Sequence, residues 1–148
     1  RKFIRPRLVV YSAILLVMFG TLGFSLAGKS TADVTILRGL GAPFSVLPSG
    51  EVSNQIRIKI ANRADTERSY AFELVDGDGL TMVAPENPLT VAAGDSQITA
   101  AFITAPPSDF TGGELEITLR ITDGVDFEEI RTYRLLGPAN RGARYGVT

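Results

Sequence analysis

The chain has 148 residues, 45% of them hydrophobic, and its 15 lysines and arginines against 16 aspartates and glutamates give a formal net charge of −1. It contains no cysteine, histidine or tryptophan. It therefore lacks the thiolate and imidazole ligands of zinc, iron–sulfur and haem sites, and it has no histidine to activate a serine nucleophile. Because the charge is balanced and residues 30–148 carry no basic stripe, we expect no nucleic-acid partner.

The first element is an uncharged run of twenty residues, Leu8–Ala27 (LVVYSAILLVMFGTLGFSLA). A helix rises about 1.5 Å per residue, so the run spans about 30 Å, the thickness of a bilayer's hydrocarbon core. The sequence therefore predicts a transmembrane helix over residues 8–27, with the lipid bilayer as its first partner. Tyr11 and Phe24 near its ends are candidate interfacial anchors or merely face lipid. Gly23 and Ala27 form a small-xxx-small pair that either admits a second helix or reflects scattered small residues.

The charges on the two sides of this run differ in sign. Residues 1–7 hold four arginines and lysines and no acid, whereas residues 30–148 hold ten basic and sixteen acidic residues, a net charge of −6. Lysine and arginine are retained on the cytoplasmic side of a membrane helix. We therefore predict a cytoplasmic stub over 1–7, a linker over 28–32 and an exported remainder. A cleaved signal peptide is the alternative, since Ser25-Leu26-Ala27 fits a cleavage site, although signal cores usually span only about 7–15 residues.

A formal nucleotide-binding motif overlaps the end of the apolar run. Gly23-Phe-Ser-Leu-Ala-Gly28-Lys29-Ser30 satisfies the phosphate-loop pattern G-x-x-x-x-G-K-S. That motif needs a short buried strand before its loop and a helix after it. Here a long apolar run precedes it, and the strand-like segment Asp33–Arg38 follows it. We interpret the match as a coincidence and expect no nucleotide partner.

Beyond residue 32, apolar and polar residues alternate in short runs separated by turn residues. The clearest run is 54–61, in which three isoleucines face one way and Arg57 and Lys59 face the other. A strict period of two predicts a half-buried antiparallel strand. We expect further strands at 33–38, 44–47, 69–75, 89–91, 114–122 and 127–136, and one in which Ile98, Ala100 and Phe102 share a face.

Such spacing, without any helical period after residue 32, is typical of an all-β fold. About seven to nine short strands predict an immunoglobulin-like or fibronectin-like antiparallel β-sandwich over residues 33–138, preceded by one transmembrane helix. Residues 139–148 show no periodic apolar pattern and are expected to form a flexible tail. The cysteine and tryptophan signature of antibody domains is absent, so the similarity concerns the architecture alone.

One acidic turn resembles a calcium loop. Asp76-Gly-Asp78-Gly79 matches the start of an EF-hand loop, but the fifth and twelfth positions hold Leu80 and Asn87, which are not the ligands that the motif requires. We interpret the segment as a solvated turn.

A second acidic turn, Asp123-Gly-Val-Asp126 followed by Glu128-Glu129, could gather carboxylates at a hairpin. Catalytic carboxylate pairs need a cleft that shifts their pKa values, which the pattern does not show. We interpret it as a turn with an exposed strand and assign no catalytic, cofactor-binding or metal residue. Asn54 and Asn62, which bracket the clearest strand, are expected to cap turns and bond backbone groups.

The order of these segments resembles one protein family. The most telling stretch is the Asn-x-Ile-x-Ile-x-Ile-x-Asn pattern after Gly50. The matching segments are Arg5-Pro-Arg7-Leu-Val-Val-Tyr11, Val34-Thr-Ile-Leu-Arg38-Gly39, Gly41-Ala-Pro43-Phe44, Gly50-Glu-Val-Ser-Asn54, Ile56-Arg-Ile-Lys-Ile-Ala-Asn62-Arg63, Tyr70-Ala-Phe-Glu-Leu74 and Arg134-Leu-Leu-Gly137-Pro138. They resemble the FixG, RdxA or CcoG family, which comprises membrane-bound accessory proteins of cbb3-type cytochrome oxidase.

The resemblance implies a larger protein in the bacterial inner membrane. Such proteins carry several membrane helices, a cytoplasmic ferredoxin-like segment with 4Fe-4S motifs, a last helix and a periplasmic Ig-like domain, and they are linked to oxidase maturation through copper reduction or handling. Because the sequence begins with Arg rather than Met, we expect it to be a piece of such a chain. The clusters would lie outside these residues, which hold no ligating cysteine, and we expect no cofactor here.

The expected function is that of a non-catalytic, membrane-anchored docking or scaffold module. Its partners would be oxidase subunits or assembly factors. One alternative is a general single-pass envelope β-sandwich for adhesion, and another is a separately encoded accessory subunit of a membrane complex. An enzyme is the least favoured class, because no nucleophile–base pair can be built without histidine or cysteine.

Overall fold

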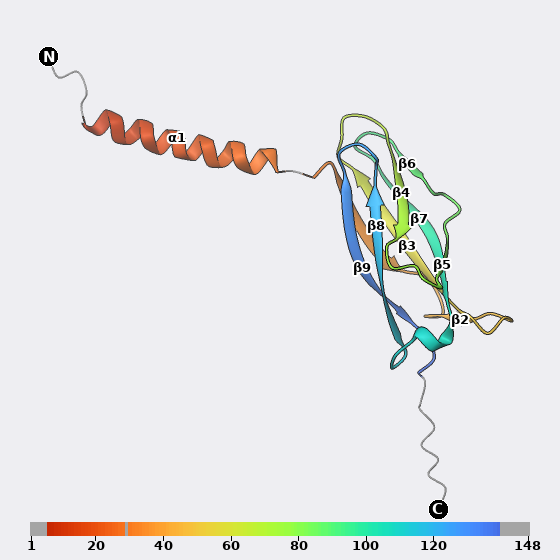
Figure 1. Ribbon diagram of the computed structural model, residues 1–148. Coiled ribbons are helices and arrows are strands. Elements are labelled where there is room, and N and C mark those ends of the chain that lie inside the picture. Colours follow the sequence, from red (N-terminus) through yellow and green to blue (C-terminus); the bar gives the residue numbers. More distant parts are fainter. Residues whose placement is uncertain (1–5, 29, 140–148) are drawn as a thin grey trace, which may run out of the picture. The chain divides into compact units, whose positions relative to one another are not determined.

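The computed structural model describes residues 6–28 and 30–139, which divide into two compact units after Ser30. The first unit is one helix, α1 (Pro6–Ala27), and the second contains the strands (Figure 1). Residues 1–5 of the expected stub, Lys29 of the linker and residues 140–148 of the expected tail lie outside the described residues.

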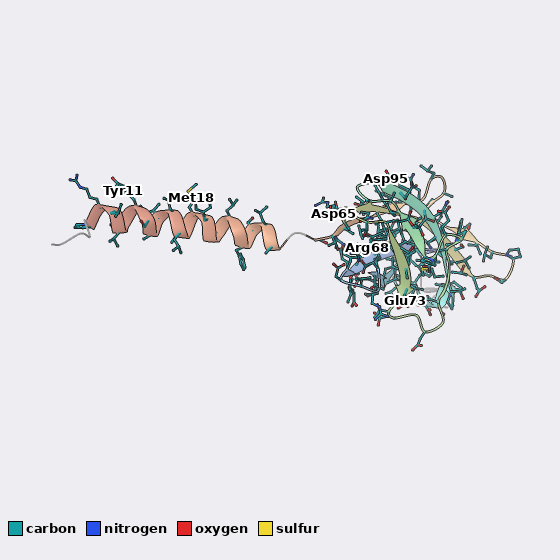
Figure 2. The ribbon with its side chains drawn as sticks, turned by 90° about the horizontal axis from the view of Figure 1, so that it is seen from above. Tyr11, Met18, Asp65, Arg68, Glu73 and Asp95 are labelled. Atoms are coloured by element: carbon teal, nitrogen blue, oxygen red, sulfur yellow. The ribbon has the colours of Figure 1, made fainter. Side chains whose placement is uncertain are left out.

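Helix α1 begins at Pro6 rather than Leu8, because proline is favoured in a first turn, where its missing N–H costs no helical hydrogen bond. None of its side chains is buried. Figure 2 shows these side chains, Tyr11 and Met18 among them, standing out around the helix. Within the described residues, α1 is the one helix that is long and apolar enough to cross a bilayer.

The second unit is a sandwich of two antiparallel sheets, as the sequence predicts (Figure 1). One sheet has the order β1-β3-β7-β5, with β2 paired to β3, and comprises β1 (Ala32–Arg38), β2 (Ser45–Val46), β3 (Val52–Asn62), β5 (Thr81–Val83) and β7 (Ser96–Ala105). The other has the order β6-β4-β8-β9 and comprises β4 (Arg68–Leu74), β6 (Leu89–Val91), β8 (Glu114–Thr122) and β9 (Glu128–Leu136). A short 3-10 turn, η1 (Pro107–Asp109), separates β7 from β8.

The core lies between the two sheets and follows the period of two. The predicted inward isoleucines of β3 are at most 1% exposed, and so are Tyr70 and Phe72 of β4. Burying one such side chain stabilises the fold by about 1.5–3 kcal/mol. The inward face predicted for β8 is also confirmed, with Ile117, Leu119 and Ile121 buried and Leu115 partly buried.

In strand β7, the alternation of residues does not determine which side of the strand faces the core. Ile98, Ala100 and Phe102 share a face as predicted, but this is the outer face, on which Ile98 is 48% and Phe102 is 39% exposed. The inner face carries Thr99, Ala101, Ile103 and Ala105. The reason is the pairing with β3: Ala101 lies opposite Ile56, and residues directly opposite each other point to the same side of a sheet. The burial of the β3 isoleucines therefore decides the orientation of β7.

Strand β5 is not predicted from the sequence. It has only three residues, Thr81–Val83, which is too short for a period of two to be recognised. It forms because its residues pair with Phe102, Ile103 and Thr104 of β7 at the edge of the sheet.

Asparagine side chains join the strands, as predicted for Asn54 and Asn62. The Nδ2 of Asn54 donates to the carbonyl of Leu136 at 2.9 Å, and the N–H of Leu136 donates to Oδ1 of Asn54 at 3.0 Å. This pair links β3 of one sheet to β9 of the other. Asn62 donates to the carbonyls of Thr66 and Val91 at 2.9 and 3.0 Å and so holds the turn after β3 against β6. Each amide satisfies backbone groups that the ladders leave unpaired.

Candidate functional site

The residues of the phosphate-loop match do not form a phosphate-loop structure. Gly23 to Ala27 belong to the last turns of α1, and the next regular element is the strand β1, which begins at Ala32. The motif requires the opposite order, a strand before the loop and a helix after it. Gly28 is exposed in a turn, and Lys29 lies outside the described residues.

The turn with Asp76 and Asp78 is solvated, as predicted. Both residues are exposed, and the turn closes through the N–H of Leu80, which donates to the carbonyl of Gly77 at 3.0 Å. The side chain of Asn87 is occupied elsewhere: its Oδ1 accepts from the N–H of Phe72, and its Nδ2 donates to the carbonyl of the same residue, both at 3.0 Å. Asn87, which occupies the last position of the calcium pattern, is therefore already hydrogen-bonded to the backbone of β4.

The turn between β8 and β9 is present, as predicted, but one of its carboxylates is buried. The side chain of Asp123 is only 1% exposed. Its Oδ1 accepts the backbone N–H groups of Val125, Asp126 and Phe127 at 2.9, 3.2 and 3.0 Å. Its Oδ2 accepts from Nη1 of Arg68 at 2.8 Å, and the same Nη1 lies 3.2 Å from Oδ1 of Asp126. Arg68 opens β4, 55 residues earlier in the chain (Figure 2).

The electrostatics of this cluster are those of a structural anchor. Burial disfavours the charged form of Asp123, but the three N–H donors and Arg68 outweigh it and hold its pKa below the usual value. Burial, together with the nearby Asp123, raises the pKa of Tyr70, whose ring packs edge-on against Phe127 at a centroid distance of 5.8 Å. Since donors surround the carboxylate, it is poorly placed to act as a base. Across 6–28 and 30–139, no three acidic side chains are grouped to hold a metal ion.

On the outer face of the β6-β4-β8-β9 sheet, arginines pair with acids of neighbouring strands. Arg120 of β8 forms an ion pair with Glu73 of β4, which Figure 2 labels. Arg134 of β9 lies 3.4 Å from Glu114 of β8. We call this surface the paired face.

The opposite surface, the outer face of the β1-β3-β7-β5 sheet, is different, and we call it the basic–apolar face. Val83, Ile98 and Phe102 stand on it with 56%, 48% and 39% of their area exposed. Arg57 and Lys59 of the central strand β3 lie beside them. Its members form three cross-strand rows: Val83–Phe102–Gln55, Ala100–Arg57–Leu37 and Ile98–Lys59–Thr35.

The two cations of the basic–apolar face have no acidic partner in the described part of the chain. No carboxylate oxygen of a described residue lies within 4.0 Å of Arg57 or Lys59, and Asp33, at the far end of β1, pairs with Arg63 at 3.3 Å. The Nε of Arg57 is buried and, among the described residues, makes no hydrogen bond. The face therefore presents positive charge between half-exposed apolar side chains.

A recess of about 190 Å³ opens at one end of this face. Phe102 of β7 forms one wall, and Leu40, Ala42 and Phe44 of the segment between β1 and β2 form the other. Ser45, Ser53 and Gln55 complete its lining. The alternation of residues in β3 predicts that Arg57 and Lys59 lie on the polar side of the strand, but their apolar neighbours are set by the pairing of β3 with β7.

Comparison with known proteins adds a family and a fold. A family model described as the IG-like fold at the C-terminus of FixG matches residues 22–138. The crystal structure of a FixG-related protein from Vibrio parahaemolyticus is similar with a TM-score of 0.62 and 16% sequence identity, over 74% of this chain and 98% of that chain. At that identity the likeness shows the fold alone. None of the curated proteins compared with the chain matches it.

Proposed function

Because the chain belongs to the family of Ig-like domains at the C-terminus of FixG, we propose that it is a membrane-anchored, non-catalytic docking module that serves the assembly of a cbb3-type cytochrome oxidase. The observation that carries the docking role is the basic–apolar face. Exposed apolar side chains next to unpaired charge have no role in the core of the sandwich, and contiguous apolar patches on a surface mark interaction sites. An oxidase subunit or an assembly factor would be the partner.

The proposal places α1 across the bacterial inner membrane with the sandwich in the periplasm. The length and apolar composition of α1 support a membrane span, and the four cations of residues 1–7 support a cytoplasmic N-terminus. In this arrangement the sandwich meets its partner on the periplasmic side, and copper or iron–sulfur chemistry belongs to other segments of a larger protein. The sequence has no cysteine or histidine to carry such chemistry.

The proposal is tested by deleting residues 31–148 from the full-length protein while α1 is retained. We expect the shortened protein to accumulate in the membrane and the amount of assembled oxidase, measured by haem staining and oxygen consumption, to fall. Because the proposed role is docking and not catalysis, residues 31–148 supplied on a separate membrane anchor should restore oxidase assembly. Unchanged oxidase assembly after the deletion would contradict the docking role and favour an envelope or adhesion function.

A further inference from the structure

We infer that the basic–apolar face is the surface on which this module binds its partner, and that the partner is a protein presenting acidic side chains beside apolar ones. The inference rests on the docking role proposed above and adds the place of binding and the chemistry of the bound surface. Three observations carry it: the exposed apolar rows, the two unpaired cations and the recess beside Phe102.

The first observation concerns area. Strands lie about 4.8 Å apart and rise about 3.3 Å per residue, so four strands over six residues cover roughly 300–400 Å². The largest apolar patch on a typical soluble monomer covers about 300–600 Å² and is often functional, and this face, with its polar side chains counted, has a similar extent. Val83 and Phe102 stand directly opposite each other, and Phe102, Ala100 and Ile98 follow one another on the same side of β7, so the apolar side chains run along β7 and reach β5 at Val83.

The second observation concerns charge. Residues 30–148 carry a net charge of −6, yet the strand at the centre of this face presents two cations and no acid on its outer side. The Nε of Arg57 is already removed from water without a hydrogen bond to any described residue. A carboxylate brought by a partner would pair with the accessible part of this guanidinium, which has no acid of its own among the described residues. The face is therefore complementary to an acidic surface.

The third observation decides between a protein and a lipid surface. Each lysine or arginine near an anionic lipid surface contributes about 1 kcal/mol to binding, and segments that bind such lipids carry about four to eight of these residues. The described part of this face offers Arg57 and Lys59. Its aromatic side chain Phe102 lines a recess of about 190 Å³, which has room for a side chain of a protein partner. These features favour a protein.

The open edge of β9 is a poorer docking place. Glu129 and Arg131 lie on the inner side of this edge strand and form an ion pair with each other. Charges that point inward on an edge strand oppose the addition of another strand. Docking by strand addition at β9 is therefore disfavoured, whereas docking on the flat basic–apolar face meets no such obstacle.

The test uses the full-length protein in its own membrane with a photoreactive residue at Ile98. A matched probe at Ile130, which is 58% exposed on the paired face, is the positional control. We expect a discrete protein adduct from Ile98 alone, with an acidic segment of the partner identified at the linkage. The double variant Arg57→Glu/Lys59→Glu should lower its yield about tenfold or more, because it sets like charges against the partner.

The control for charge reversal is Arg120→Glu/Arg134→Glu, which makes the same change in net charge on the paired face and should leave the adduct unchanged. Arg57→Met/Lys59→Met, which keeps the aliphatic stems, should lower the yield less than the reversal does. Protease resistance of each variant reports its folding. An adduct with lipid, an adduct with a second copy of this chain, or a yield unaffected by the reversal would overturn the inference.

The two proposals fail in different ways. If deletion of residues 31–148 impairs oxidase assembly but the Arg57→Glu/Lys59→Glu variant assembles oxidase normally, the docking role stands and the basic–apolar face is the wrong place. If the deletion has no effect on the oxidase while Ile98 still captures an acidic protein, the face binds a partner that is unrelated to the oxidase.

Discussion

The paired face and the basic–apolar face belong to the same sandwich, but they treat charge in different ways. On the paired face, Arg120 and Arg134 each have an acid from a neighbouring strand. On the basic–apolar face, Arg57 and Lys59 have no such acid among the described residues and stand beside half-exposed apolar side chains. The first arrangement is complete within the sheet and needs no external partner. The second arrangement suits an external partner.

The largest expected effect on stability comes from Asp123, the buried carboxylate in the turn between β8 and β9. Asp123→Asn removes the charge that three N–H groups and Arg68 stabilise, so we expect the free energy of unfolding to fall by about 2–3 kcal/mol. Urea unfolding of a fragment that begins at Thr31 measures it, because every core residue lies after that position. Asp126→Asn is the matched control: it contacts the same arginine but is 52% exposed, and it should cost much less.

The effect of Asp123→Asn should also depend on pH. The pKa of Asp123 in the folded protein lies below the unfolded value of about 3.9, so its contribution is fully present above that value and is lost as the pH falls through the folded pKa. The difference in stability between the wild-type fragment and Asp123→Asn should therefore shrink on acidification from pH 7 towards pH 3. A difference that stays constant over this range would mean that the carboxylate is not ionised as described.

A substitution on the basic–apolar face is expected to change the free energy of unfolding in the opposite direction. Arg57→Met keeps the apolar stem of the side chain but removes the buried Nε, which lacks a hydrogen bond within the described residues. We expect the free energy of unfolding to stay unchanged or to rise by up to about 1 kcal/mol. The same urea experiment measures it, with Lys59→Met as the exposed control. A loss of stability above about 1 kcal/mol would show that Arg57 serves the fold and would weaken the contrast between the two faces.

The elements that the sequence predicts well are those whose pattern is local. The alternation of β3 and β8 is strict, so their buried faces follow from the order of residues alone. In β7 the outer residues Ile98 and Phe102 are more hydrophobic than the inner Thr99 and Ala101, so hydrophobicity cannot identify the core side. Pairing with the isoleucines of β3 decides it, and such pairing is a property of the assembled sheet.

The same limit applies to the candidate sites. The solvated turn at Asp76 could be predicted, because its glycines and exposed acids act locally. Asp123 could not be predicted as buried, because its main charged partner, Arg68, lies on another strand 55 residues away. The basic–apolar face joins residues of β3, β5 and β7, and β5 itself is too short to be recognised in the sequence.

The smallest expected effect concerns Glu73 and Arg120, the exposed ion pair of the paired face. The hydrogen bond to Glu73 and its charge raise the pKa of Arg120, yet both side chains are about half exposed, and water and salt screen their attraction. A double-mutant cycle with Glu73→Gln and Arg120→Gln should give a coupling free energy near the detection limit of urea unfolding, and lower still in about 1 M salt. A coupling as large as the loss caused by Asp123→Asn would mean that these pairs hold the sheet together. A weak coupling would leave them a different role: each gives an arginine of the paired face an acid of its own, which keeps this face unattractive to the acidic partner that the opposite face is proposed to bind.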